Sequence, residues 1–391
     1  MINQTKNMKS VQTEGPVLAV NSGSSSLKFG LFIPRNGDEV AILKGGADGI
    51  GRPDGTLKIG DGDGKSLLDE TYSLPTQGHA LEEILKAIAK FGGGDPVAVG
   101  HRIVHGGPHL REHQRITPEL TATLRSAVHF APLHIPPALA LIGETERLLP
   151  QTRQYACFDT AFHSTMPPTA FRYGLPEELY RKGVQRYGFH GLSYESVVHR
   201  LGNPMPSRVV CAHLGSGASL AALRDGRSVD TSMGMTPTGG IPMATRCGDL
   251  DPGILLFLMR TENANADTLE TLLNRRSGLT ALSGSEADMR QLLAAMNKEK
   301  GDAAATLAVQ VFVGAVRKFI GAYAAELGGL DLLVFTGGIG EHSGPIRKLI
   351  CAGLDFLGIS GGEPGPGSKV VVMSSEEEAQ IARHCRRLMN S

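Results

Sequence analysis

The chain has 391 residues, a length that predicts two domains of ordinary size. Its 39 Lys and Arg residues balance its 39 Asp and Glu residues, so the formal net charge is zero, and we expect neither nucleic acid nor a membrane as a partner. The five cysteines are scattered and form no Cys-x-x-Cys pair, which argues against a zinc ribbon or a disulfide framework and favours a reducing, cytoplasmic compartment.

Residues 1–16 lack the apolar core of a signal peptide, and we interpret them as a disordered extension. In the rest of the chain, no apolar run approaches the roughly 20 residues that a membrane-spanning helix needs.

The first ordered segment is predicted to be a hairpin. Two apolar runs of strand length, residues 17–20 and 27–32, flank the polar turn 21–26. Small residues in a turn allow backbone N–H groups to point together at phosphate oxygens, and Lys28 would add a positive charge beside them. A single Gly/Ser turn more often only connects two strands, so this hairpin alone does not identify a phosphate site.

A helix is predicted over residues 80–91, where apolar side chains recur on one face. A short strand over residues 97–100 follows and leads into Arg102.

A second hairpin of the same kind is predicted over residues 208–226, again with a Gly/Ser turn at its tip. Aligning Ser26-Leu27 with Ser219-Leu220 overlays the two turns and the strands before them. This similarity indicates an internal duplication, with one phosphate-binding hairpin in each half of the chain.

Near the C-terminus, a long amphipathic helix is predicted over residues 304–329, ended by Gly328-Gly329. A buried strand over residues 331–335 then runs into the glycine turn TGGIGE, an arrangement that presents a helix N-terminus to a nucleotide. The last helix is predicted over residues 374–388, with Ser374 or Ser375 as its N-cap.

Four side chains suggest chemistry on an anionic substrate. Arg102 follows a strand, where its fork of donors suits a carboxylate or phosphoryl group, and Arg246 lies in the Gly/Pro-rich run TPTGGIPMATRCGDLDP. Asp159 ends an apolar strand, and His190 lies in a glycine-flanked loop. Taken singly, each has an ordinary structural alternative: an ion pair for the arginine, a turn or cap for the aspartate, and a buried structural role for the histidine.

Several common catalytic motifs are missing from the sequence. It has no P-loop, no protein-kinase loop set, no His-Glu-x-x-His metal motif and no G-x-S-x-G nucleophile elbow.

Taken together, these segments closely resemble the acetate kinase family over residues 17–387. The resemblance rests on an ordered set of motifs, namely VNSGSSSLKF, GHRIVHGG, APLHIPP, FDTAFH, RYGFHG, TPTGGIPMATRCGDLDP and FTGGIGE. It implies an α/β fold of two duplicated ribonuclease-H-like lobes, as in actin-like ATPases, with the active site in the cleft between them. It also implies a homodimer.

On this basis we expect an N-terminal lobe over residues 17–160, joined by the C-terminal helix 376–391. The nucleotide-binding and dimerisation lobe is expected over residues 161–375.

The resemblance also implies roles for individual residues. The expected catalytic residues are Asp159, Arg102, His190, Arg246 and His134. Besides Arg102, a small apolar pocket for the substrate's methyl group is expected from Val104, Leu133, Phe189 and Pro237.

Nucleotide contacts are expected from Lys28, from His213, Leu214, Gly215, Ser216 and Gly217, from Asp288, Met289 and Arg290, and from Gly337, Gly338, Ile339, Gly340 and Glu341. Mg²⁺, or Mn²⁺ in its place, is expected at Asn21 and Glu377. Glu377 is chosen from its distance to Ile381-Ala382, and the choice among Glu376, Glu377 and Glu378 stays open.

The implied reaction is reversible transfer of the γ-phosphoryl group of ATP to acetate, which gives acetyl phosphate and ADP. A propionate kinase is the first alternative, because one methylene in an apolar pocket changes binding by only about 1–3 kcal/mol. A conformational ATPase of the same superfamily is the second.

Overall fold

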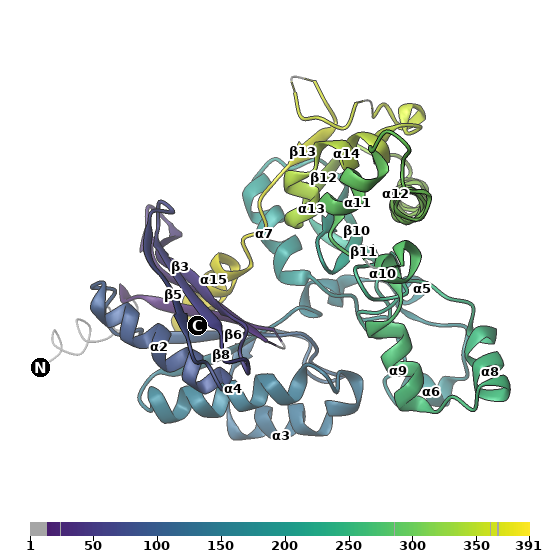
Figure 1. Ribbon diagram of the computed structural model, residues 1–391. Helices are drawn as coiled ribbons and strands as arrows, with labels where there is room; N and C mark the ends of the chain where they lie inside the picture. Colours follow the sequence, from purple (N-terminus) through teal and green to yellow (C-terminus); the bar gives the residue numbers. More distant parts are fainter. Residues whose placement is uncertain (1–13, 24, 285, 360, 366) are drawn as a thin grey trace, which may run out of the picture. The chain divides into compact units, whose positions relative to one another are not determined.

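The computed structural model describes residues 14–391 except residues 24, 285, 360 and 366. Most of the extension predicted over residues 1–16 therefore lies outside the described residues. The chain divides into two compact units, which are coloured along the sequence in Figure 1. Unit 1 consists of residues up to Ala161 together with Glu376–Ser391, and unit 2 is Phe162–Ser375.

Unit 1 is built on a sheet of eight strands in the order β5-β4-β3-β2-β1-β6-β8-β7. Its strands are β1 (Val17–Ser22), β2 (Ser26–Arg35), β3 (Asp38–Asp48), β4 (Gly55–Asp61), β5 (Ser66–Tyr72), β6 (Ala98–Ile103), β7 (Gln114–Arg115) and β8 (Arg153–Phe158). Its helices are α2 (Gln77–Lys90), α3 (Pro118–Ser126), η1 (Val128–Phe130), α4 (Ile135–Leu148) and α15 (Glu377–Asn390).

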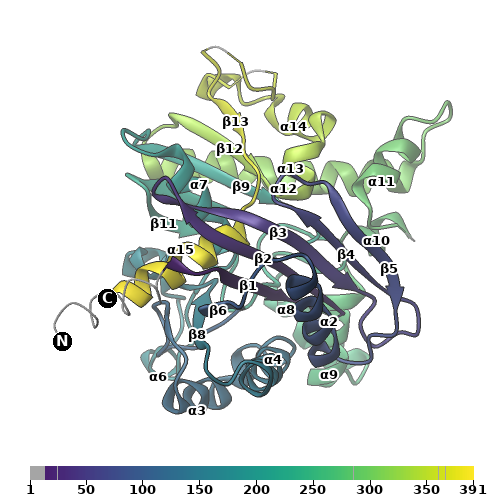
Figure 2. The ribbon, with the colours of Figure 1, turned by 90° about the vertical axis from the view of Figure 1, so that its left-hand side faces the viewer.

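The two faces of this sheet are covered by helices from distant parts of the chain, as Figure 2 shows. Val99 of β6 belongs to the apolar core that also contains Leu81 and Ile84 of α2. Its neighbour Gly100 points to the other face, where a Cβ would lie 2.3 Å from Ile381 of α15. The C-terminal helix therefore forms one layer of the N-terminal unit.

Unit 2 has a sheet of five strands in the order β11-β10-β9-β12-β13. These strands are β9 (Arg208–Leu214), β10 (Ala218–Arg224), β11 (Arg227–Thr231), β12 (Leu332–Thr336) and β13 (Val370–Val372). Its helices, after η2 (Ala161–Thr165) at the boundary, are α5 (Pro168–Phe171), α6 (Glu177–Arg181), α7 (Gly191–Leu201), α8 (Pro252–Thr261), α9 (Ala266–Arg275), α10 (Gly278–Ser283), α11 (Met289–Met296), α12 (Ala303–Leu327), α13 (Gly337–His342), α14 (Gly344–Cys351) and η3 (Asp355–Leu357).

Helix α12 is the central helix of unit 2. Asp302 caps its first turn, and Gly328 ends it in the left-handed conformation, which confirms the predicted C-cap. By length and composition α12 is apolar enough to cross a membrane, which is an exception to the sequence expectation. Its buried residues recur at helical spacing, from Ala305 through Phe312 to Leu327, and it packs on β9 and β10, so it is a core helix.

The two sheets share one strand plan. In unit 1, β2 is antiparallel to both β3 and β1, while β6 is parallel to β1 and to β8. In unit 2, β10 is antiparallel to both β11 and β9, while β12 is parallel to β9 and to β13. The same five-strand order therefore occurs twice, and the prediction of a duplicated α/β fold of ribonuclease-H type is confirmed.

The ungapped alignment of the two hairpins is wrong in detail. Leu27 pairs with Ser22, but Leu220 pairs with Ala212 and not with Gly215 as that alignment requires. The second turn closes more tightly, since Leu214 already pairs with Ala218.

The predicted cap of the last helix is also wrong. Helix α15 begins after Glu376 and has no side-chain cap. Ser374 and Ser375 are engaged elsewhere: Ser374 accepts from Arg200, and Ser375 donates its N–H to Glu341 and its hydroxyl to Ser193.

Gly337 makes the sharp turn from β12 into α13. Its φ is +76°, and a Cβ at this position would lie 2.8 Å from the carbonyl oxygen of Leu214. Its neighbour Gly338 has open space around it and no positive φ. Of these two positions, therefore, only 337 has a backbone conformation and surroundings that require a glycine.

We expect Gly337→Ala to lower the free energy of unfolding by about 2–4 kcal/mol. The alanine would be forced into the left-handed backbone conformation, and its Cβ would clash with the carbonyl oxygen of Leu214. Gly338→Ala is the matched control and should stay within about 0.5 kcal/mol of the parent. Urea unfolding of both variants measures this, and equal stabilities would contradict the assignment.

One buried histidine in each unit is held neutral. Burial lowers the pKa of His101, whose ring bonds Gln154, from 6.5 to about 4. Burial likewise lowers the pKa of His163 to about 4. Because the folded-state pKa lies below the unfolded value, this stability is present above pH 6.5 and is lost as the pH falls toward 4.

We therefore expect the urea midpoint to fall between pH 7 and pH 5, with each histidine contributing up to about 2 kcal/mol over this range. His101→Gln should flatten this dependence. An unchanged slope in His101→Gln would show that other groups cause the loss.

Candidate functional site

In unit 1, the expected site residues gather at one edge of the sheet. Strands β1, β6 and β8 are adjacent and parallel, so their carboxyl ends lie together. Asn21 is near the end of β1, Arg102 is near the end of β6, and Asp159 directly follows β8. Helix α15 begins at the same place and contributes Glu377.

Arg102 and Asp159 form a bidentate ion pair. Arg102 Nε lies 3.1 and 3.0 Å from the two carboxylate oxygens of Asp159, and Nη2 lies 2.6 Å from Oδ2. Asp159 is fully buried, whereas the Arg102 side chain is 19% exposed. Burial alone would lower the pKa of Arg102, but the charges of Asp159 and Glu377 outweigh it and raise that pKa. The guanidinium therefore stays charged in a fixed orientation.

Asn21 connects this pair to α15. Its Oδ1 accepts a hydrogen bond from Arg102 at 3.0 Å, and its Nδ2 donates to Glu377 at 3.1 Å and to Glu378 at 3.2 Å. Glu376 instead lies 3.8 Å from Arg383. The two carboxylates offer hard oxygen donors of the kind that Mg²⁺ prefers, and their contacts with Asn21 favour Glu377, with Glu378 beside it, over Glu376.

Lys28 is directly opposite Asn21 in the β1–β2 ladder, so both side chains leave the same face of the sheet. His134 precedes the first turn of α4, and Leu133 before it is 37% exposed. Val104 follows the end of β6. The structure thus brings Asn21, Lys28 and Arg102 together with Asp159 and Glu377.

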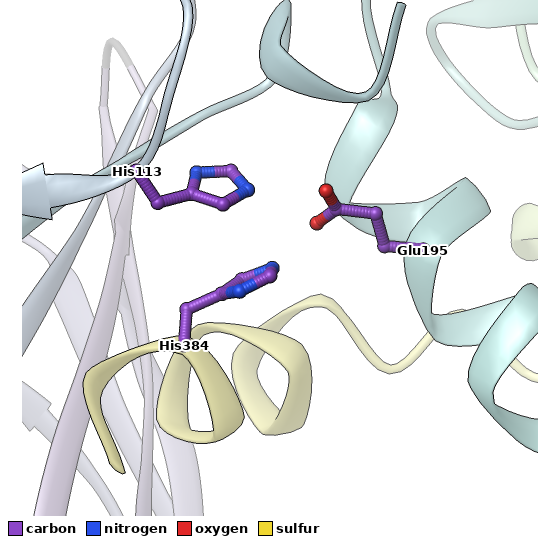
Figure 3. A group of neighbouring side chains, drawn as sticks. All are labelled: His113, Glu195 and His384. Atoms are coloured by element: carbon purple, nitrogen blue, oxygen red, sulfur yellow. The ribbon is translucent and has the colours of Figure 1, made fainter. Parts of the chain in front are cut away.

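Sequence reasoning missed His113 and His384, whose rings lie 3.9 Å apart in unit 1 (Figure 3). His113 Nδ1 accepts a hydrogen bond from the backbone N–H of Phe158, the residue before Asp159. His113 therefore fixes the end of β8. The two histidines are far apart in the sequence, so no local motif signals the pair.

In unit 2, two histidines flank the glycine turn of the second hairpin. The rings of His190 and His213 are stacked with centroids 4.2 Å apart. A Cβ on Gly217 would lie 3.2 Å from His190 Nε2, and one on Gly215 would lie 3.8 Å from His213 Nε2. The 3.2 Å approach at Gly217 is tighter than an ordinary side-chain contact, so a residue without a side chain suits this position.

Arg246 reaches the same turn. Its Nη1 lies 3.8 Å from the Cβ position of Gly217 and donates to the carbonyl oxygen of Pro237 at 2.9 Å. The backbone N–H of Ala244, two residues earlier, donates to the carbonyl oxygen of Ser216 at 3.4 Å. Arg246, His190 and the Gly/Ser turn are therefore one group.

The glycine turn after β12 adjoins this group. A Cβ on Gly215 would lie 3.9 Å from the backbone nitrogen of Gly338. Glu341 Oε1 accepts the N–H groups of Gly337 and Ser375, at 3.0 and 2.9 Å, and so fixes the turn.

For other residues expected in the site, the structure shows contacts away from the glycine turns of unit 2. Asp288 caps α11 and pairs with Arg290, whose side chain is 89% exposed. Within the part of unit 2 that the structure describes, no hydrogen bond or ion pair links them to the glycine turns. Phe189 is buried, and its carbonyl oxygen lies 3.0 Å from His163 Nε2.

The sequence matches the Acetokinase family over residues 16–382. An acetate kinase of Oceanobacillus iheyensis is 39% identical, with 95% of this chain and 98% of that protein covered. The crystal structure of Porphyromonas gingivalis acetate kinase has a TM-score of 0.84 at 38% identity and covers 96% of this chain and 100% of its own. A propionate kinase structure from Francisella tularensis has a TM-score of 0.86 at 32% identity, over 95% and 98% of the two chains.

A match over nearly the whole length, with the family's motifs gathered at the strand ends and glycine turns described above, shows that this chain belongs to the acetokinase family.

Proposed function

We propose that the chain is an acetate kinase that reversibly transfers the γ-phosphoryl group of ATP to acetate, giving acetyl phosphate and ADP. The observation that carries the proposal is the position of the Arg102 guanidinium near the end of β6. Three hydrogen bonds to the buried carboxylate of Asp159 hold it there. A fixed fork of N–H donors binds a carboxylate or a phosphoryl group with both charge and orientation.

Phosphoryl transfer to a carboxylate requires alignment of the two reactants and neutralisation of charge. Acetate is already ionised at neutral pH, so the reaction needs no general base. Asp159 is therefore proposed to orient Arg102 and to contribute to the metal site, while Arg102 binds the acetate and the transferring group.

Arg246 and His190 of unit 2 are proposed to act on the same phosphoryl group. Arg246 Nη1 and His190 Nε2 both lie beside the glycine turn, 3.8 and 3.2 Å from the Cβ position of Gly217. Such donors stabilise the charge on the equatorial oxygens in the transition state. The turn at residues 337–341 is proposed to bind the nucleotide, with Lys28 on its phosphates and Asp288–Arg290 as a further contact.

We propose Asn21 and Glu377 as the ligands of Mg²⁺, or of Mn²⁺, since Asn21 contacts the carboxylates of both Glu377 and Glu378, which offer hard oxygen donors. When bound, the metal neutralises the charge of the nucleotide phosphates. We also propose a cytoplasmic location, in line with the scattered cysteines.

We propose that Val104, Leu133, Phe189 and Pro237 enclose the methyl group of acetate, with His134 near the substrate. The similarity to a propionate kinase structure makes propionate the first alternative substrate. An apolar pocket distinguishes two acids that differ by one methylene by only about 1–3 kcal/mol.

With ATP and Mg²⁺, we expect acyl phosphate to form faster from acetate than from propionate or butyrate, when trapped as the hydroxamate. Arg102→Ala should lower kcat by about 10²- to 10⁴-fold, because a transition-state contact is removed and Asp159 loses its partner. Arg147→Ala is the matched control, since Arg147 only pairs with Glu144 on the exposed surface of α4.

A faster reaction with propionate than with acetate would show that propionate is the preferred substrate, and the proposed mechanism would still hold. Slow ATP hydrolysis with no acyl phosphate from any of the three acids would instead support a conformational ATPase.

We further propose a homodimer formed through α8 of unit 2. Helix α8 has no buried residue, and Ile254, Leu256, Phe257 and Met259 are 42–59% exposed. Large apolar side chains exposed along a whole helix mark a protein contact, and a second copy of the chain is the partner that family membership favours.

Light scattering coupled to gel filtration should give a dimer for the parent chain and a monomer for Leu256→Glu/Phe257→Glu. Phe356→Glu is the control, because Phe356 is 75% exposed outside this face. A parent monomer, or a dimer that survives the α8 substitutions, would refute the proposed interface.

A further inference from the structure

His190 is held in an unfavourable backbone conformation. Its φ is +58°, in the left-handed region that non-glycine residues seldom adopt, and it forms the N-cap of α7. Such a conformation persists only where surrounding contacts enforce it.

One contact fixes the backbone just before it. His163 Nε2 lies 3.0 Å from the carbonyl oxygen of Phe189, and His163 Nδ1 lies 2.8 Å from Ser228 Oγ. A carbonyl can only accept, so His163 carries its hydrogen on Nε2 and accepts from Ser228 at Nδ1. Gly188 packs against the same ring, with its Cβ position 2.5 Å from His163 Cδ2.

A second set of contacts fixes the His190 ring. Its Nδ1 lies 2.8 Å from Ser219 Oγ, and Ser219 Oγ lies 2.5 Å from the Tyr194 hydroxyl. Ser219 and Tyr194 are both fully buried. Tyr194 is in the first turn of α7, one turn after His190, and Ser219 is in β10 directly after the Gly/Ser turn.

The other ring nitrogen faces the turn, since the Cβ position of Gly217 lies 3.2 Å from His190 Nε2. Phosphoryl oxygens only accept hydrogen bonds, so a useful Nε2 must carry a hydrogen. A neutral imidazole with a hydrogen on Nε2 requires a donor at Nδ1, and the Ser219 hydroxyl is in position to be that donor.

We propose that Ser219 and Tyr194 are positioning residues for His190. In this relay the Tyr194 hydroxyl donates to Ser219 Oγ, and the Ser219 hydroxyl donates to His190 Nδ1. The relay fixes the ring orientation and places the hydrogen on Nε2, toward the phosphoryl group. The inference rests on the proposed phosphoryl transfer for its catalytic meaning, but the tautomer itself can be measured without turnover.

Kinetics of three variants test the relay. Ser219→Ala should lower kcat by about 10- to 100-fold and leave KM for ATP and acetate nearly unchanged. Tyr194→Phe keeps the ring that fills the core and removes only the hydroxyl, and should lower kcat by about 3- to 10-fold. The double variant should be no slower than Ser219→Ala, because both changes interrupt one relay.

Ser196→Ala is the matched control. Ser196 is a buried serine on the same helix that donates to the backbone carbonyl of Ser193, and its replacement should leave kcat within about twofold. Multiplying losses in the double variant, or a wild-type kcat in Ser219→Ala, would overturn the proposal while leaving the proposed function intact.

Histidine ¹H–¹⁵N spectra of the substrate-free protein give the second readout. We expect the Nε2–H tautomer of His190 in the parent and a mixture of tautomers in Ser219→Ala. Identical spectra would overturn the relay. If the parent made no acyl phosphate, the proposed function would fail on its own, and these spectra would still decide the relay.

Discussion

Asp159, a carboxylate with no exposed surface, sets the requirements for the rest of unit 1. A buried charge is stable only if a partner satisfies it closely, and Arg102 does so with three hydrogen bonds. Arg102 in turn requires the oxygens of Asn21 and Glu377, which draws the end of β1 and the start of α15 to the same point. The parallel order of β1, β6 and β8 is what allows these groups to meet, because it brings their carboxyl ends to one edge. Fold and charge pairing are thus mutually dependent here.

The two units apply one strand plan to different chemistry. Asn21 and His213 both lie next to last in the first strand of their sheets, opposite Lys28 and Ser219 respectively. In unit 1 the position is surrounded by carboxylates and a guanidinium, which suits a cation and a carboxylate. In unit 2 it is surrounded by the imidazole of His190, the hydroxyl of Ser193 and the glycine turn. Duplication supplied the geometry, and the side chains at equivalent strand ends diverged.

The sequence was sufficient to predict the elements with strong local signals. Apolar runs predicted both hairpins, and the Gly328 cap and the strand before Gly337 were also placed correctly. Contacts between residues far apart in the chain left no local trace, as with His113 and His384 or with His163 and Phe189. The cap of α15 failed for the same reason: Ser374 and Ser375 have capping chemistry, but Arg200, Ser193 and Glu341 engage them from distant segments. The hairpin alignment failed because a tighter turn shifts strand pairing without changing the residue types.

The placement of α15 has a consequence for how the protein is made. Unit 2 is continuous in sequence, whereas unit 1 needs α15 against Gly100, where Ile381 and Cys385 leave no room for a side chain. A ribosome therefore releases most of unit 1 first, yet that unit lacks one layer of its sheet until residues 377–390 have emerged. During that interval the face beside Gly100 is uncovered apolar surface, a candidate for chaperone binding on the nascent chain. The segment that is synthesised first is thus the last to be completed.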